Sequence, residues 1–398
     1  MKPLNWLFAL VITLFVAAAQ AQAPLRIGST LSLTGPLSQT AIVHKLVGEI
    51  YVDDLNRKGG LLNRKVEWVL RDDQSRPDNA RTLYEQLVTV DKVDLLMGPY
   101  ATANILSAMG VAQRFNKVLI HHSFGVPQLA KYDLQFPTIG FSSDPEDMLP
   151  NLVLDAANSG PRPPKTVAIV TSKFPSLHFI SVGAREVVKK RGLKEVLYLE
   201  WDFGNREFGP IATRIRDAKP DFVWVGAIGV EGIMLTEAMQ RLDYQPPLQM
   251  HLFPAPGATA RNPLTKNVLS VTTFEEHPPF TDNPVAAAFV KQFRERAAKA
   301  GLQDQTVDLQ AAISFAAWQA LERAVTATGS VSDKAVGDWL KKNSVDTIMG
   351  RLAWNGPNNF LQPGMHLYKV KQVQDGNWAV VWPRQYAKPG VQLLVTGQ

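Results

Sequence analysis

Cysteine is absent from this chain of 398 residues, and only seven residues are histidine. The lack of cysteine excludes disulfides, thiolate metal sites and cysteine nucleophiles, and the histidines form no ligand pair at helical spacing. The chain contains no G-x-S-x-G, phosphate-loop, H-E-x-x-H or G-x-G-x-x-G pattern. The glycine-rich segment 226–232 does not match G-x-G-x-x-G, because its glycines have the wrong spacing. We therefore expect no enzymatic activity, no cofactor and no bound metal.

Strong charge of one sign is also missing. The formal net charge is +6, and charged residues make up 20% of the chain. The densest basic run is Lys189 to Arg191, at the end of a predicted helix, where cations are favoured by the helix dipole. We expect no binding to nucleic acid.

Only the N-terminus carries a long apolar run. Lys2 supplies a positive charge, Leu4 to Ala18 is apolar, and residues 19–23 are small enough for cleavage, which is typical of a secretory signal peptide. We place the cut after Ala21, so that residues 1–21 are removed. The alternative is a membrane anchor, for which the run is short. Because no cysteine is available for a lipid anchor, we expect a free periplasmic protein.

The remaining chain is too long for one typical hydrophobic core, so two domains are expected. Strands and helices alternate strictly in the first third, which indicates a parallel sheet covered by helices. Residues 141–145 interrupt the alternation, and it then restarts in a second unit of similar length. Helices are expected over 285–300, 309–328 and 332–341, followed by a hairpin of 367–373 with 378–381 around a Gln-Asp-Gly-Asn turn.

Residues 93–108 are the most informative segment. A short buried strand over 93–97 is broken by Gly98-Pro99, and Thr102 and Asn104 are candidate caps for the helix that follows. The free amides at such a helix start attract anions, and in open α/β sheets ligands collect at the carboxyl ends of strands. The alternative is an ordinary strand-to-helix connection without a ligand.

A resemblance to a known family rests on several segments in that family's order and spacing. They are RIGSTLSLTGPLS at 26–38, DDLNRKGGLLNRKVE at 53–67, RDDQSRPDNA at 71–80, MGPYATA at 97–103 and GRLAWNGPNN at 350–359. The chain resembles the branched-chain amino-acid binding proteins of ABC importers, which have the type I periplasmic binding fold.

The resemblance implies two Rossmann-like α/β lobes with parallel central sheets, joined by three hinge crossings, with the ligand between them. The crossings are expected near 140–144, 270–275 and 349–354. Lobe 1 would then combine residues 24–141 with 274–348, and lobe 2 would combine 142–273 with 349–398. The expected motion is hinge closure around the ligand.

The resemblance places two loops of lobe 1 in the cleft. Thr102 falls on the hydroxyl position that helps to hold the ligand's carboxylate, with Tyr100 and Ala101 on the same wall. In the second loop Ser123 matches a ligand-contacting position, Phe124 is bulky and apolar, and Gly125 stands where amino-acid binders usually carry Thr.

Lobe 2 is expected to contribute Glu231, which aligns with the acidic residue that pairs with the ligand's ammonium group. The alternative for Glu231 is ordinary charge pairing at a helix start. Ser176 stands where relatives carry a Tyr that packs on the ligand, and Phe174 is a partial substitute. With these departures, a carboxylate or amide ligand with an apolar or aromatic body fits the expected site at least as well as leucine or valine does.

The resulting hypothesis is a monomeric periplasmic solute-binding protein that captures a small amino-acid-like, organic-acid or amide ligand and delivers it to the permease subunits of an ABC importer. The alternative is a ligand-sensing protein that signals to a receptor, because both functions use this fold.

Overall fold

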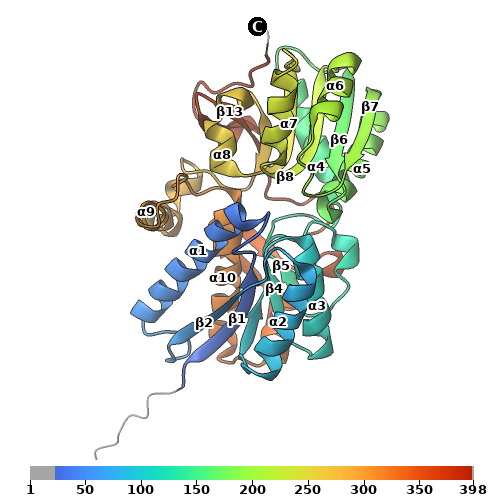
Figure 1. The fold of residues 1–398 in the computed structure, drawn as a ribbon. Helices are drawn as coiled ribbons and strands as arrows, with labels where there is room; N and C mark the ends of the chain where they lie inside the picture. The colour runs from blue at the N-terminus through green and yellow to red at the C-terminus, as the bar shows by residue number, and fades with distance from the viewer. Residues whose placement is uncertain (1–22, 397–398) are drawn as a thin grey trace, which may run out of the picture.

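The computed structural model describes residues 23–396, which form two α/β lobes, one above the other in Figure 1. The predicted signal peptide, residues 1–21, lies outside the described residues. Each lobe is built on a largely parallel sheet with helices packed against it. The two-lobed α/β architecture predicted from the sequence is confirmed.

The lower lobe contains a fully parallel sheet in the order β2-β1-β3-β4-β5. Its strands are β1 Leu25–Leu31, β2 Val66–Asp72, β3 Leu95–Met97, β4 Leu119–His121 and β5 Gln135–Pro137. Its helices are α1 Ser38–Arg57, α2 Pro77–Thr89, α3 Thr102–Arg114, α9 Pro284–Lys299, α10 Leu309–Thr328 and α11 Asp333–Lys342. The short strand β5 was not predicted.

The upper lobe contains a sheet in the order β14-β13-β10-β9-β8-β6-β7, in which β13 and β14 are antiparallel. Its strands are β6 Thr166–Ser172, β7 Lys194–Trp201, β8 Phe222–Gly229, β9 Leu248–Pro254, β10 Leu269–Thr272, β13 Lys369–Gln374 and β14 Asn377–Trp382. Its helices are α4 Pro145–Asn158, α5 Pro175–Lys190, α6 Gly209–Ala218, α7 Glu231–Gln240 and α8 Pro256–Arg261. The C-terminal hairpin appears as predicted, whereas β10 and α8 were not predicted.

Local chemistry explains where the long C-terminal helices begin and end. The Asn283 side chain accepts the Val285 N–H at 2.9 Å before α9, and Asp308 accepts the Gln310 N–H at 3.0 Å before α10. Each bond satisfies an amide that has no intrahelical partner. Gly329 ends α10 with φ +60°, a conformation that costs glycine little.

Two of the connections between the lobes lie side by side. Ser142 pairs with Leu361 in a parallel bridge, and the Leu367 N–H donates to the Gly140 carbonyl at 3.1 Å. This pairing couples the two segments, because a movement of one strains the hydrogen bonds of the other.

We propose that the third connection falls later in the chain than the expected residues 349–354. Trp354 Nε1 donates to the Pro137 carbonyl at 2.8 Å, and the Asn359 side chain donates to the Asp133 carbonyl at 2.9 Å. The hairpin of β11 (Ser344–Thr347) and β12 (Gly350–Ala353) precedes these contacts with the lower lobe. We therefore propose that lobe 1 extends to about residue 360, with the other predicted boundaries kept.

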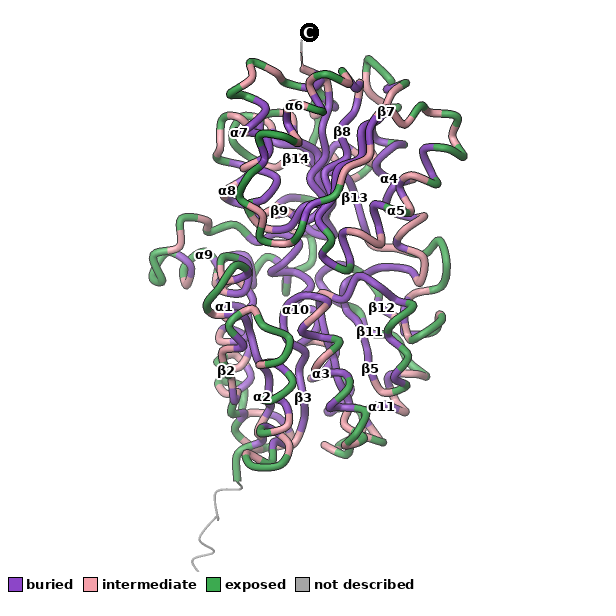
Figure 2. The backbone as a smooth tube through the Cα atoms, turned by 45° about the vertical axis from the view of Figure 1, so that its right-hand side comes forward, coloured by how far each residue is buried: buried purple, intermediate pink, exposed green. Residues whose placement is uncertain are grey.

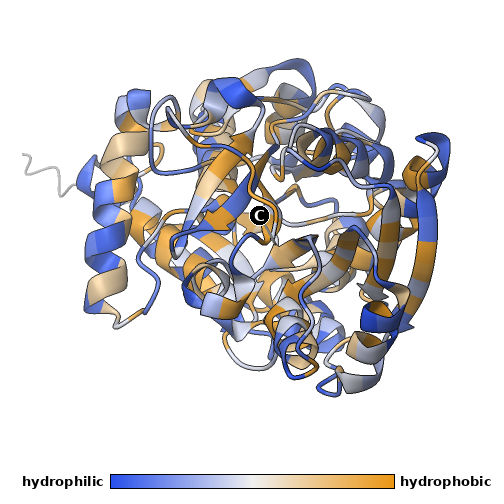
Figure 3. Cartoon of the chain, turned by 90° about the horizontal axis from the view of Figure 1, so that it is seen from above, coloured by the Kyte–Doolittle hydropathy of each residue, from blue (hydrophilic) through white to orange (hydrophobic). Residues whose placement is uncertain are grey.

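Burial follows the layered arrangement. The central strands of both sheets are buried, and exposed residues lie along the outer helices and loops (Figure 2). Viewed from above, the strands are mostly hydrophobic and hydrophilic stretches lie in the peripheral helices and loops (Figure 3). Within residues 23–396, none of the helices combines the length and apolar character needed to cross a membrane.

Candidate ligand-binding site

A small cavity lies between the two lobes. The first loop of the lower lobe, at the carboxyl end of β3, contributes Tyr100, Ala101 and Thr102. Across the cavity, the upper lobe contributes residues from β8, β9 and the start of α5. The complete lining is Tyr100, Ala101, Thr102, Ser123, Gly125, Ile139, Phe174, Ser176, Ile228, Phe253, Leu309, Gln310 and Ile313. The position agrees with the rule that ligands bind beyond the carboxyl ends of parallel strands.

The lining is apolar apart from a few hydroxyl and amide groups, and none of the lining residues within the described part of the chain is charged. Aromatic and branched side chains form most of the wall, whereas Thr102, Ser123, Ser176, Tyr100 and Gln310 supply the polar side chains. This composition is typical of a small-molecule site, where a few placed polar groups orient a ligand in an apolar cleft.

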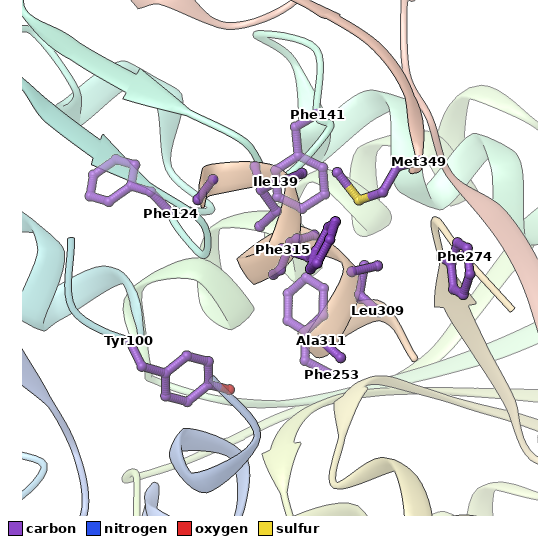
Figure 4. Packing of buried hydrophobic residues seen from close by; sticks show 14 of the residues in the cluster. Tyr100, Phe124, Ile139, Phe141, Phe253, Phe274, Leu309, Ala311, Phe315 and Met349 are labelled. Carbon is purple, nitrogen blue, oxygen red and sulfur yellow. The ribbon is translucent and has the colours of Figure 1, made fainter. Parts of the chain in front are cut away.

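The predicted residues Tyr100 and Phe124 differ in orientation. Tyr100 points toward the start of α10, while the Phe124 ring points away from the central cluster (Figure 4). Phe124 is fully buried and packs against the His121 ring, with 5.6 Å between ring centroids. Of the sequence-predicted residues of lobe 1, the structure therefore brings all except Phe124 to the cavity.

The two hydroxyl-bearing residues of lobe 1 join its two loops. The Ala101 N–H donates to Ser123 Oγ at 2.9 Å, and the Gly125 N–H donates to Thr102 Oγ1 at 3.1 Å. Because each hydroxyl oxygen already accepts a backbone N–H, its own proton is free to donate elsewhere. Both residues line the cavity, so they can offer two O–H donors to an acceptor such as a carboxylate.

Side-chain capping of α3 was predicted incorrectly. The N-cap residue is Ala101, and neither Thr102 nor Asn104 accepts a hydrogen bond from the first helical amides. Asn104 instead donates to Ser32 Oγ at 3.3 Å. The first amides of α3 therefore remain without a side-chain partner beside the cavity, and such amides favour an anionic group.

Ala101 has a strained backbone. Its φ of +73° and ψ of 147° lie in a region that is essentially restricted to glycine. Strain of this kind costs about 1–3 kcal/mol and persists only where the surrounding contacts require it. Here the Ala101 N–H is held by Ser123, which fixes the loop at the cavity wall.

We expect Ala101→Gly to stabilise the protein by about 1 kcal/mol, because glycine removes the strain at the cost of some additional chain entropy. Urea unfolding at neutral pH measures the change. Ala103→Gly, inside the first turn of α3, is the matched control and should destabilise by about 1 kcal/mol. Equal destabilisation by both changes would contradict a strained Ala101.

Gly125 of the lower lobe lies close to Ser176 of the upper lobe. A Cβ added to Gly125 would lie 2.7 Å from Cβ of Ser176, in the first turn of α5. No real pair of such carbon atoms tolerates that distance. The glycine that replaces the usual Thr of amino-acid binders therefore permits the observed approach of the two lobes.

Glu231 is not among the cavity-lining residues. It is the first residue of α7, is 5% exposed, and accepts the Gly204 N–H at 3.1 Å. Burial raises the pKa of the Glu231 carboxyl, while the Gly204 amide and the Trp201 indole oppose that rise. Of the predicted residues of lobe 2, Phe174 and Ser176 line the cavity and Glu231 does not.

Six lining residues were not predicted. Sequence reasoning placed no ligand contact at the start of α10, because apolar residues in the first turn of a long helix have the pattern of ordinary core residues. The buried cap Asp308, immediately before that helix, was the only sequence signal available there. The residues missed are Ile139, Ile228, Phe253, Leu309, Gln310 and Ile313.

Two stacked, buried histidines lie next to Tyr100. The rings of His44 and His122 are stacked with centroids 4.2 Å apart, and His44 lies 4.8 Å from the Tyr100 ring. Burial lowers the pKa of His44 to about 3, against a smaller opposing effect of Gln310, and lowers that of His122 well below its ordinary value. Both rings are therefore neutral, and they place no charge next to Tyr100.

Comparison with known proteins identifies the family. The family described as "Periplasmic binding protein" matches residues 24–377. Leu/Ile/Val-binding protein homolog 1 of Brucella melitensis is 23% identical over 363 residues, covering 90% of this chain and 93% of the relative. This agrees with the resemblance seen in the sequence segments.

Two solved structures share the fold. A solute-binding protein of an ABC transporter from R. palustris, solved with benzoate, superposes with a TM-score of 0.75 at 20% identity, covering 90% of this chain and 95% of that one. The binding protein LivJ of Streptococcus pneumoniae, solved with isoleucine, gives a TM-score of 0.74 at 18% identity, covering 90% and 99%. Because the family match spans most of the sequence, the chain belongs to the periplasmic binding proteins, a family of non-enzymatic solute binders with the type I fold.

Proposed function

We propose that the mature protein is the periplasmic solute-binding component of an ABC importer and that it closes its lobes around a small carboxylate with an apolar or aromatic body. The observation that carries this proposal is the uncharged cavity between the lobes, with the Thr102 hydroxyl at the start of α3 and the Ser123 hydroxyl in the loop beside it. A carboxylate accepts hydrogen bonds from such donors and from the free helix amides, and the remaining wall suits an apolar body.

The charge pattern argues against a zwitterionic amino acid as the best ligand. An ammonium group buried without a carboxylate partner is costly, and Glu231 already accepts a hydrogen bond from Gly204 away from the cavity. We propose that Glu231 stabilises the loop around Gly204 and does not contact ligand. The solved relative that holds benzoate, an acid without an ammonium group, supports this ligand class. The relatives named for leucine, isoleucine and valine support the alternative that the ligand is a branched-chain amino acid.

A matched pair of ligands tests the proposal. Leucine and 4-methylpentanoate share the carboxylate and the branched body, and they differ only in the ammonium group. Isothermal titration calorimetry should show 4-methylpentanoate or benzoate binding at least about tenfold more tightly than leucine, since an unpaired buried charge costs more than 1.4 kcal/mol. Tighter binding of leucine than of both acids would refute the ligand class while leaving the solute-binding function intact.

The Thr102 hydroxyl is expected to contribute directly to affinity. Thr102→Val keeps the side-chain shape but leaves the Gly125 N–H without its acceptor and removes the O–H donor, so the Kd for benzoate or 4-methylpentanoate should rise about tenfold to a hundredfold. Thr102→Ser retains the hydroxyl and should stay within about threefold of the wild type. If Val and Ser at this position gave the same affinity, the hydroxyl would have no part in binding.

A further inference from the structure

The segments that connect the lobes hold two buried hydroxyl groups. Ser142, in the first connection, is fully buried, and Tyr368, directly before β13, is 2% exposed. Within residues 23–396, neither Ser142 Oγ nor the Tyr368 hydroxyl oxygen has a hydrogen-bond partner. Buried polar side chains in native proteins are nearly always paired, so two unpaired hydroxyls in the hinge region require an explanation.

Backbone hydrogen bonds alone hold the first and third connections together at this point. The Ser143 N–H donates to the Leu361 carbonyl at 3.1 Å, and the Leu361 N–H donates to the Phe141 carbonyl at 3.3 Å. The two hydroxyl groups take no part in this pairing. In the present arrangement of the lobes they therefore lose their hydration without gaining a hydrogen bond, which is unfavourable.

The Tyr368 ring links the hinge region to the ligand cavity. It stacks on Phe141 with ring centroids 4.9 Å apart, and the Phe141 ring lies 6.4 Å from that of Phe253, which lines the cavity. Phe141 and Phe253 are labelled in Figure 4 together with Ile139, another lining residue. Burial raises the pKa of the Tyr368 hydroxyl well above its ordinary value, so this group keeps its proton and is a donor without an acceptor.

The structure shows the lobes in a closed arrangement, because residues of both lobes enclose the cavity and Gly125 lies close to Ser176. Opening changes the backbone angles of a few residues in the connections, so it alters the surroundings of Ser142 and Tyr368 more than those of residues inside either lobe. Separation of the lobes also brings solvent to the Phe253 end of the aromatic column. Both hydroxyl groups can then pair with water or with a backbone carbonyl.

We propose that Ser142 and Tyr368 form an opening device, in which two unpaired hydroxyl groups disfavour the closed form and keep the lobes apart until a ligand supplies the free energy of closure. Neither residue lines the ligand cavity, so both are positioning residues. The opening device rests on the proposed function, because it requires capture of a ligand by lobe closure. Removal of either hydroxyl should populate the closed form and tighten binding, since apparent affinity scales with the population of the binding-competent state.

The test measures the Kd values of benzoate and leucine by calorimetry on the wild type, Ser142→Ala, Tyr368→Phe and the double variant. Each single change removes one hydroxyl oxygen and otherwise keeps the shape of the side chain. We expect each to lower the Kd about fivefold or more, and the double variant to lower it further. Within one variant the factor should be the same for both ligands, because the opening device acts on closure and not on a ligand contact.

Tyr132→Phe is the matched control. The Tyr132 hydroxyl is paired inside the lower lobe, where it donates to the Lys117 carbonyl at 2.9 Å. Its removal should lower the urea concentration at the midpoint of unfolding and leave both Kd values unchanged. The control thus separates a loss of local stability from a shift in lobe closure.

Unchanged or higher Kd values in both single variants would overturn the opening device, because the two hydroxyl groups would then have the same surroundings in the open and closed forms. A change for one ligand and not for the other would also overturn it, since the residues would then act on ligand contacts. In both outcomes a ligand still binds, so the proposed solute-binding function stands. If leucine binds the wild type and benzoate does not, the proposed ligand class fails, and the leucine Kd values still decide the opening device.

Discussion

Lowering the pH from 7 to 5 is expected to reduce the free energy of unfolding by about 4 kcal/mol, because several buried histidines must stay neutral in the folded state. His44, His121 and His251 are buried, and burial lowers their pKa values to about 3, 4 and 3, respectively. His122 shifts in the same direction.

The sign follows from proton binding. Below pH 6.5 the unfolded chain protonates these histidines, whereas the folded chain does not until the pH approaches their lowered pKa values. The unfolded state thus binds more protons, and stability falls as the pH falls, by about 2 kcal/mol per histidine between pH 7 and 5. For the three with a stated pKa the loss is about 6 kcal/mol.

Asp308 works in the opposite direction. Its folded pKa of about 7 exceeds its ordinary value, so the folded state binds a proton that the unfolded chain does not bind until much lower pH. This contributes about 2 kcal/mol of stability as the pH falls from 7 to 5, so these three histidines and Asp308 together leave a loss near 4 kcal/mol.

Urea unfolding at pH 7, 6 and 5 measures the effect. His251→Gln removes one buried imidazole and should reduce the loss between pH 7 and 5 by about 2 kcal/mol. Gln240→Ala, on an exposed side chain without an ionisable group, is the control and should leave the pH dependence unchanged. If the free energy of unfolding differed by less than about 1 kcal/mol between pH 7 and 5, these rings would not be buried in their neutral form.

The fold was largely predictable because local signals and global arrangement agree. The range 309–328 matched α10 at both ends, since Asp308 caps its start and Gly329 ends it. The strands that were missed are short or lack flanking turns, as with β5 and its three residues. In such segments the sheet neighbours supply the stabilising hydrogen bonds, and the segment's own sequence carries little pattern.

The candidate site was predictable only in part. Family segments located the two loops of lobe 1, from Tyr100 to Gly125. The orientation of Phe124 depends on packing against His121, and that of Glu231 depends on a loop that approaches from residue 204. Such contacts join residues that are distant in sequence or belong to neighbouring elements, so a pattern read along one chain does not determine them.

Gly125→Ala is expected to weaken ligand binding about tenfold to a hundredfold by preventing full closure of the lobes. The new Cβ would lie 2.7 Å from Cβ of Ser176, and relieving such a contact typically costs about 1–3 kcal/mol. The loop itself should accept alanine, because Gly125 is not among the residues with positive φ. Stability without ligand should therefore change little, while the Kd for benzoate or 4-methylpentanoate rises.

A double mutant separates closure from local damage. Ser176→Gly removes the atom that the new Cβ would strike, so Gly125→Ala combined with Ser176→Gly should recover most of the affinity that Gly125→Ala loses. Gly110→Ala is the control, because its Cβ would meet nothing within 4 Å on the exposed side of α3. Calorimetry on the four proteins gives the coupling energy between positions 125 and 176. A coupling near zero would mean that the lobes close without this contact, and that the alanine acts only on its own loop.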